Sequence, residues 1–424
     1  MKHFRWLMPG LEIKRWILLS ILGILLLSIS ISHFFTIMGV TTTTSSYIPI
    51  GLLGILFICT GLYQCMKSLL GDINYLRNPL FNQSINQQIY DKKILSRRPK
   101  IVVIGGGTGL SILLRGLKLF TTNITAIVTV ADDGGGSGVI REDLGMLPPG
   151  DIRNCILALA EMEPTMEKLF QYRFEDGSLK GQSFGNLFIA SMNGISSNFE
   201  EAVKRVSEVL AVTGEVYPVT LENITLYARL KNDTVIKGES NIQIKSLELN
   251  SPIDRVFIKP KEVEGLKEAV EAIEEADIVV LGPGSLYTSI MPNLLVKNII
   301  SALERSSNKK VYISNIMTQP GETDGYGIKD HVDGILKHCP KLKLDYVIAN
   351  NGIVQMDAYS KYQEEGAELV IPKNEDRRYL QKKGIKLIEE NFIEIKKNYI
   401  RHDAVKVSRV IVDLVAKKPK KYFI

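Results

Sequence analysis

Three glycine-rich segments contain residues whose types and spacing could bind a phosphorylated ligand. The first follows the apolar run Ile101–Ile104 and consists of Gly105, Gly106, Gly107, Thr108 and Gly109. Glycine has no Cβ atom, so backbone N–H groups at the start of the next helix can approach a phosphate closely. The spacing departs from the G-x-G-x-x-G pattern of dinucleotide-binding folds. The segment therefore predicts phosphate contact, with close packing as the alternative, and argues against an NAD-dependent oxidoreductase.

The second segment places two carboxylates in front of several glycines. Asp132 and Asp133 follow the apolar run Ile124–Val130 and precede the letters GGGSG. A carboxylate at the end of this strand can accept hydrogen bonds from a ribose. Two adjacent carboxylates can instead hold Mg²⁺, which shares oxygen ligands with a diphosphate. The pair therefore predicts either a sugar contact or a metal site.

The third segment repeats the strand, glycine loop and helix pattern of the first. Gly282, Pro283, Gly284 and Ser285 follow the strand-like run Ile278–Leu281. Two such loops in one sheet indicate a site for a phosphate or a sugar more specifically than either loop alone. Neutral polar groups follow another strand in Asn315–Thr323.

The sequence leaves the roles of two further polar residues open. Asn186, within the letters SFGNLF, has an amide that could read a base or a sugar at the start of a helix. Arg153 could reach a phosphate or pair with Asp143, and the sequence does not separate these alternatives.

The elements that position these loops alternate between strand and helix from Lys100 onward. Continuous apolar runs separated by helical patterns are typical of a parallel sheet that is covered on both faces. We therefore expect an α/β fold with a Rossmann-like, doubly wound and mostly parallel sheet, in which ligands bind beyond the carboxyl ends of the strands. Short alternating pieces between Glu215 and Pro260 indicate a small antiparallel excursion. The remaining predicted elements are the strands Lys310–Ile313 and Tyr346–Ala349 and the helices Leu110–Leu117, Phe199–Val212, Val263–Ala276 and Asn293–Leu303.

The N-terminal part has a different composition. No Asp, Glu, Lys or Arg occurs from Trp16 to Met66, and each half of this stretch provides the roughly 20 apolar residues of a membrane helix. A signal peptide has a shorter apolar region and no second span. Basic residues flank both spans, which predicts that both ends are cytoplasmic. We therefore expect a multi-pass protein of the cytoplasmic membrane, with its C-terminal domain in the cytoplasm.

The predicted organisation has three parts. Residues 1–70 form a transmembrane hairpin, residues 71–99 a juxtamembrane linker, and residues 100–424 the α/β domain. The basic end of the linker could contact an anionic lipid membrane or be solvated. The four cysteines and five histidines show no metal-like spacing.

Six ordered motifs give the domain a family resemblance. The letters GGGTGL, ADDGGGSG, PPGDIRN, SFGNLF, LGPGSLYTS and TQPGETDG resemble the 2-phospholactate transferases (CofD-like), and most closely the bacterial gluconeogenesis factors of YvcK type. The resemblance implies a Rossmann-like fold and a role in cell shape and cell-wall precursor supply during gluconeogenic growth. It implies a UDP-sugar ligand, notably UDP-N-acetylglucosamine. No enzymatic reaction is implied for this branch, whereas its transferase relatives move a phospholactyl group.

The resemblance also assigns residues. It implies that the loops Gly105–Gly109 and Gly282–Ser285 hold the diphosphate, and that Asp132 and Asp133 lie at the sugar or a metal. Tyr362 and Arg401 match UDP-sugar contacts, with an ion pair to Asp403 as the alternative for Arg401. The letters GGGSGVI depart from the more usual GGSSGRL, so Gly136 and Val139 could alter a phosphate contact. The membrane hairpin is a second departure.

The sequence therefore predicts a UDP-N-acetylglucosamine-binding regulator. A Mg²⁺-dependent phospholactyl-type transferase is the alternative, and an NAD-binding oxidoreductase is the weakest. We also expect a regulatory protein partner, a homo-oligomer and no nucleic acid.

Overall fold

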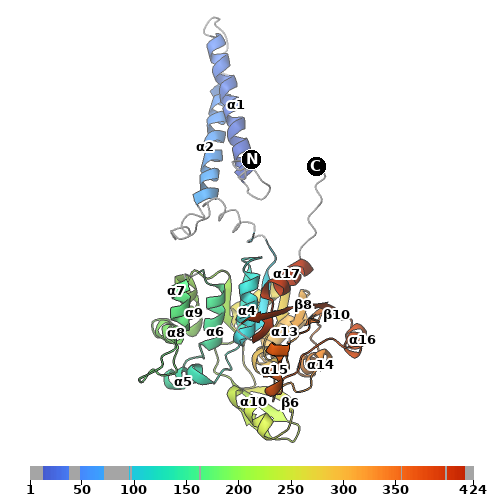
Figure 1. Ribbon diagram of the computed structural model, residues 1–424. Coiled ribbons are helices and arrows are strands. Elements are labelled where there is room, and N and C mark those ends of the chain that lie inside the picture. Colours follow the sequence, from blue (N-terminus) through green and yellow to red (C-terminus); the bar gives the residue numbers. More distant parts are fainter. Residues whose placement is uncertain are drawn as a thin grey trace. The chain divides into compact units, whose positions relative to one another are not determined.

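The computed structural model describes residues 13–37, 48–70, 95, 98–161, 164–354, 356–396 and 399–415. It divides into two compact units, Met1–Arg97 and Arg98–Ile424, which Figure 1 shows as ribbons. The predicted linker, residues 71–99, lies almost entirely outside the described residues. So do residues 38–47, between the two N-terminal apolar runs.

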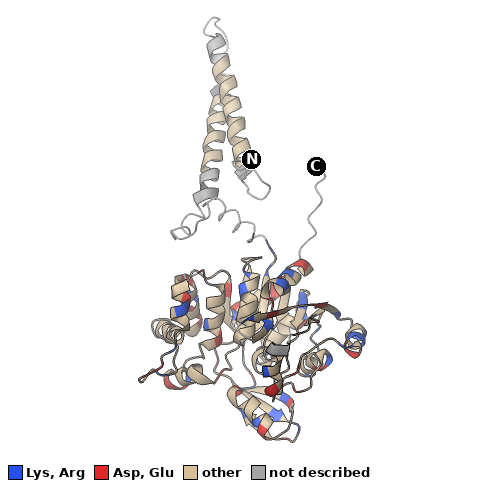
Figure 2. Ribbon diagram, viewed as in Figure 1, with Lys and Arg blue, Asp and Glu red and all other residues tan. Residues whose placement is uncertain are grey.

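The first unit consists of the helices α1 (Ile13–Ile37) and α2 (Ile48–Leu70). They pack closely because glycines lie between them: a Cβ atom on Gly23 would be 2.7 Å from the carbonyl oxygen of Gly54. In α1 and α2, the residues whose side chains are described, 16–32 and 49–64, include no charged residue (Figure 2).

The predicted membrane anchor is corrected here. Among the residues that the structure describes, no helix has both the length and the apolar character that crossing a membrane requires. The prediction of a multi-pass membrane protein is therefore contradicted.

The second unit is built on a seven-stranded sheet with the order β10-β9-β8-β7-β1-β2-β3. All neighbouring strands are parallel. The strands are β1 (Ile101–Gly105), β2 (Ile124–Val128), β3 (Glu215–Pro218), β7 (Ile278–Leu281), β8 (Lys309–Ile313), β9 (Tyr346–Asn350) and β10 (Lys386–Glu390). From β1 the chain builds outward to β3 and later returns to build outward from β7. The α/β class and the mostly parallel sheet are therefore confirmed.

Helices cover both faces of this sheet. Crossovers between parallel strands are right-handed, so reversing the direction of strand addition places the helices after β1 and after β7 on opposite faces. The longer helices between β1 and β4 are α4 (Gly107–Leu117), α5 (Gly135–Leu144), α6 (Gly150–Leu159), α7 (Pro164–Gln171), α8 (Phe184–Gly194) and α9 (Phe199–Val209). Those that follow are α10 (Glu239–Glu248), α11 (Lys267–Glu275), α13 (Lys297–Arg305), α14 (Ile328–His338), α15 (Met356–Glu364), α16 (Asn374–Lys382) and α17 (Ala404–Val415). Two short helical segments, Leu286–Ile290 and α12 (Met291–Leu294), follow β7.

The core explains why the central strands read as continuous apolar runs. Every residue of β1 and of β7 is buried, because both faces of these strands contact helices. Lys and Arg alternate with Asp and Glu over the outer helices of this unit (Figure 2).

Two small antiparallel sheets complete the second unit. One has the order β5-β4-β6, with β4 (Thr225–Leu230), β5 (Val235–Lys237) and β6 (Ile253–Lys259). This confirms the antiparallel excursion, although Glu215–Pro218 at its predicted start belongs to the parallel sheet. The other is the pair β11 (Ile393–Lys396) and β12 (Tyr399–His402).

Candidate functional site

The two glycine-rich loops meet where the direction of strand addition reverses. The first lies after β1 and the second after β7, and these strands are neighbours in the sheet. A Cβ atom on Gly109 would be 2.8 Å from the carbonyl oxygen of Pro283, and one on Gly284 would be 3.2 Å from the carbonyl oxygen of Gly106. Only glycine allows this approach without a backbone shift. Crevices at such reversal points are where open parallel sheets bind ligands.

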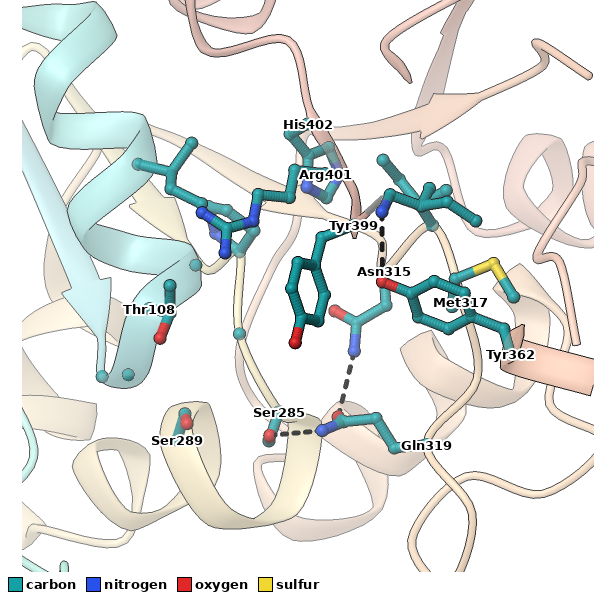
Figure 3. Close-up of a pocket in the computed structure, with 18 residues that line it drawn as sticks. Thr108, Ser285, Ser289, Asn315, Met317, Gln319, Tyr362, Tyr399, Arg401 and His402 are labelled. Atoms are coloured by element: carbon teal, nitrogen blue, oxygen red, sulfur yellow. Dashed lines mark hydrogen bonds between the residues drawn. The ribbon is translucent and has the colours of Figure 1, made fainter. Parts of the chain in front are cut away.

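A cavity of about 470 Å³ opens over these loops. Figure 3 shows its wall, with Tyr399 and Arg401 projecting between the first glycine loop and Asn315. Five segments of the chain contribute to it. The residues are Gly106, Gly107, Thr108, Gly109 and Ile112; Pro283, Gly284, Ser285 and Ser289; Asn315, Ile316, Met317 and Gln319; Tyr362; and Tyr399, Ile400, Arg401 and His402.

The start of α4 presents free N–H groups to this cavity. Gly107 has φ +67°, a left-handed conformation that glycine adopts at little cost. The Asp151 carboxylate accepts a hydrogen bond from the Gly107 N–H group. The first N–H groups of a helix have no partner within the helix, so those of Thr108 and Gly109 remain available to a ligand. The helix dipole favours an anion at this position.

Arg401 supplies the only Arg or Lys side chain among the described wall residues. Its guanidinium lies over the ring of Tyr399, 5.5 Å from the ring centroid. The alternative ion pair with Asp403 is not formed, because Asp403 pairs with Lys406 at 3.3 Å. Within the described part of the chain, Arg401 has no carboxylate partner, so its charge is available to an anion.

Tyr362 holds the strand that bears Arg401. The Ile400 N–H group donates a hydrogen bond of 3.1 Å to the Tyr362 hydroxyl oxygen. This bond ties α15 to β12 at the edge of the cavity.

His402 is neutral at this site. Desolvation lowers its pKa to about 4, and its Nε2 lies 3.2 Å from the Ser314 carbonyl oxygen. Neutral imidazole can donate to that carbonyl through Nε2. The wall therefore carries positive charge at Arg401 and not at His402.

The structure brings together most of the predicted ligand residues. Gly106, Gly107, Thr108 and Gly109 from the first loop, Pro283, Gly284 and Ser285 from the second, and Tyr362 and Arg401 all line the cavity. Gly105 and Gly282 do not line it. They lie just behind, where the Gly282 N–H group bonds the Ile104 carbonyl and the Asn293 amide bonds the Gly105 carbonyl.

Three further predicted ligand residues lie outside the cavity wall and have other partners. Asp132 accepts a hydrogen bond of 2.9 Å from the Gly134 N–H group. Asp133 accepts from the N–H groups of Glu239 and Ser240 at 3.2 and 2.9 Å, at the start of α10. Asn186 is buried and accepts from the Arg153 guanidinium at 2.7 Å. The ligand roles of these residues stay predictions.

Arg153 does not pair with Asp143, and its contact with a phosphate stays a prediction. It bonds Ser183, Asn186 and Asn154. Gly136 and Val139, the two departures from the family motif, are also outside the cavity wall.

Three carboxyl groups outside the cavity wall have raised pKa values. Desolvation raises the pKa of Asp151 to about 6, that of Glu239 to about 8 and that of Glu322 to about 7. Neighbouring carboxylates, Asp132 among them, raise the values of Asp151 and Glu239 further. A metal centre with three or more His, Cys, Asp or Glu ligands is absent from the described residues.

Sequence reasoning did not single out several wall residues. Tyr399, Ile400 and His402 come from β12, and Ile112 comes from the second turn of α4. Nothing in their local pattern distinguishes them from core or surface positions. Asn315 and Gln319 belong to a polar segment that was noted after β8, which is the signal that could have identified them.

Comparison with known proteins agrees with this geometry. The family model described as 2-phospho-L-lactate transferase CofD matches residues 101–393. The chain is 52% identical over 423 residues to a putative gluconeogenesis factor of Clostridium acetobutylicum, covering 99% of this chain and 93% of that protein. It is 44% identical over 322 residues to the gluconeogenesis factor of Bacillus subtilis, covering 76% of this chain and 99% of that protein.

A solved structure has the same fold. A member of the UPF0052 family from Bacillus halodurans, 46% identical, superposes with a TM-score of 0.70 over 73% of this chain and 98% of that chain. With a family model and relatives of this similarity, the chain belongs to the gluconeogenesis factor family and carries a CofD-like domain.

Proposed function

We propose that this protein is a UDP-sugar-binding regulator that takes UDP-N-acetylglucosamine in the cavity over the two glycine loops. One observation carries the proposal. The described wall contains the free start of α4, a second glycine loop and the unpaired Arg401, and it contains no Asp or Glu. Such a wall favours a ligand with concentrated negative charge, and a diphosphate has that property.

The rest of the wall suits a sugar nucleotide. The cavity volume of about 470 Å³ falls within the roughly 300–1,000 Å³ of small-molecule sites. Hydroxyl and amide groups of Ser285, Asn315 and Gln319 stand beside the glycine loops, and Met317 and Ile316 add apolar surface. Neutral polar groups next to an anion site fit the hydroxyls of a sugar and the edge of a base.

Membership of the gluconeogenesis factor family supports a regulatory role. Gluconeogenesis factors would couple the level of a cell-wall precursor sugar to growth on gluconeogenic carbon sources. A sensor of this kind must pass its state to another molecule, so we include a regulatory protein partner and a homo-oligomer in the proposal.

The proposal is tested by equilibrium binding of the full-length chain to UDP-N-acetylglucosamine, NAD and GTP, each with Mg²⁺ and with EDTA. We expect UDP-N-acetylglucosamine to bind most tightly and its affinity to depend little on Mg²⁺. Gly284→Val should abolish binding, because the new side chain would meet the Gly106 carbonyl. Tighter binding of NAD or GTP than of the UDP-sugar would refute the proposal.

One observation favours the Mg²⁺-dependent transferase as a second candidate. Carboxyl groups whose pKa values lie near neutrality, such as those of Asp151 and Glu322, can exchange protons during a reaction. Mg²⁺ would supply charge neutralisation on a phosphate, with Asp132 or Asp133 as its ligand.

Phosphorus NMR of the UDP-sugar after long incubation separates the two candidates. Wild type, Asp132→Asn and Asp133→Asn are compared with and without Mg²⁺. A regulator leaves the ligand intact in every sample. Metal-dependent consumption by wild type that is lost in the Asn variants would establish the transferase instead.

A further inference from the structure

Three side chains in the cavity wall form a hydrogen-bonded relay. The Asn315 amide nitrogen donates to the Gln319 side-chain oxygen at 3.3 Å, and the Gln319 amide nitrogen donates to the Ser285 hydroxyl oxygen at 2.6 Å. Figure 3 shows the relay running from Asn315 through Gln319 to Ser285 along one side of the cavity. It joins the loop after β8 to the loop after β7.

The middle residue of the relay is fixed by its own backbone. The Gln319 N–H group donates to the Thr323 hydroxyl at 2.9 Å. Its carbonyl accepts from the N–H groups of Glu322 and Thr323 at 2.9 and 2.8 Å. Gln319 therefore positions the residues at both ends of the relay.

The direction of the bonds determines what each end can offer a ligand. Ser285 uses its oxygen as an acceptor, so its hydroxyl proton is free to donate to a phosphate oxygen. Asn315 uses its nitrogen as a donor, so its side-chain oxygen, Oδ1, is the group left over. That oxygen is buried and has no hydrogen-bond partner in the part of the chain that the structure describes.

This unpaired amide oxygen disfavours the diphosphate of the ligand and favours a group that can donate a hydrogen bond. The diphosphate of a UDP-sugar carries only oxygen acceptors, which an amide oxygen cannot bond and would repel. A hydroxyl or an N–H group can donate to it. Buried polar atoms are nearly always paired, so a hydrogen bond from such a donor to Oδ1 gives a free-energy gain.

We propose that Asn315 determines specificity by accepting, through Oδ1, a hydrogen bond from a neutral donor of the ligand, and that Gln319 positions it. The proposal rests on the proposed UDP-sugar function and deepens it. The donor is either the N–H group of the uracil ring or a hydroxyl of the sugar, since both are neutral donors attached to the same diphosphate. Sites that pair a polar group of the ligand discriminate strongly against analogues that lack it.

The test compares Asn315→Leu with wild type in the full-length chain. Leucine has the same number of side-chain heavy atoms as asparagine, branched at the same carbon, but neither an acceptor nor the donor that bonds Gln319. The matched control is Asn351→Leu, because Asn351 follows β9 as Asn315 follows β8 and is exposed outside the cavity wall. The ligands are UDP-N-acetylglucosamine, UDP, inorganic pyrophosphate and UDP-N-acetylglucosamine methylated at the uracil N–H group.

Asn315→Leu should weaken UDP-N-acetylglucosamine binding about tenfold, whereas Asn351→Leu should leave it unchanged. An equal loss for UDP assigns the donor to the uridine, and a loss confined to the UDP-sugar assigns it to the sugar. If the uracil is the donor, methylation should weaken binding to wild type but not to Asn315→Leu.

Two results would overturn the inference. The first is that Asn315→Leu binds all four ligands with the same affinity as wild type. The other is an equal loss for inorganic pyrophosphate, which would indicate general damage to the cavity. In both cases the proposed function survives as long as wild type binds the UDP-sugar; if wild type does not bind it, the proposed function itself fails.

Discussion

Gly109 and Pro283 lie so close together that a Cβ atom on Gly109 would be 2.8 Å from the Pro283 carbonyl oxygen. The two residues belong to different halves of the sheet, one after β1 and the other after β7. Their contact holds the two glycine loops together beneath the cavity. The relationship predicts that small changes at Gly109 will affect both loops.

We expect Gly109→Ala to destabilise the fold by about 1–3 kcal/mol, the usual cost of overpacking, and to weaken UDP-sugar binding. The matched control is Gly194→Ala at the end of α8, where a Cβ atom would meet nothing within 4 Å. Chemical denaturation and equilibrium binding of both variants provide the measurement. If Gly109→Ala is as stable as the control and binds the UDP-sugar as tightly, the two loops tolerate separation.

Arg401 should contribute through its charge. Arg401→Gln is expected to cost about 1.5–3 kcal/mol of UDP-sugar binding, the range for hydrogen bonds to charged groups. Arg401→Lys should recover only part of this loss, because lysine cannot form the two parallel bonds of a guanidinium. Arg409→Gln, at an exposed position of α17, is the control. Equal affinities for Arg401→Gln and Arg409→Gln would contradict this role.

Tyr362 should act through β12. Tyr362→Phe removes the acceptor of the Ile400 N–H group, which we expect to loosen the strand that bears Arg401 and weaken binding by about 1 kcal/mol. Tyr359→Phe, on the same helix, removes a hydroxyl that does not line the cavity. The affinity should fall in the first variant and not in the second. If both variants bind equally, the Tyr362 hydroxyl has no positioning role.

The carboxyl group of Glu239 makes stability depend on pH. Desolvation, reinforced by Asp132 and Glu322, raises its pKa from 4.5 to about 8 in the folded protein. The folded state therefore keeps a proton that the unfolded chain loses near pH 4.5. Its contribution to stability is full below that pH and is lost as the pH rises through 8.

Glu239→Gln cannot ionise, so above pH 8 it should melt a few degrees higher than wild type, and below pH 4.5 the two should melt alike. Glu248→Gln, exposed at the far end of α10, is the control and should behave as wild type at both pH values. Thermal melts at the two pH values test this. A Glu239→Gln protein that is less stable than wild type above pH 8 would reverse the expected sign.

Elements with a strong local pattern were predicted closely. The strand Ile278–Leu281 has the predicted bounds, because a short buried run of β-branched residues between a helix and a glycine loop has few alternatives. The strand β10 (Lys386–Glu390) was missed, since its mixture of charged and apolar residues reflects its place at the edge of the sheet. Glu215–Pro218 was assigned to the antiparallel excursion although it forms the opposite edge.

The sequence by itself determined the α/β class, the two glycine loops and their place after parallel strands, because backbone freedom and hydrophobic periodicity are local properties of the chain. Tertiary structure alone decided which side chains share the cavity. Tyr399 and His402 reach it from β12, far along the chain from Gly106, whereas Asp132 and Asp133 bond nearby backbone N–H groups outside its wall. The physical reason is that a cavity is closed by contacts between segments distant in sequence, and no local pattern records them.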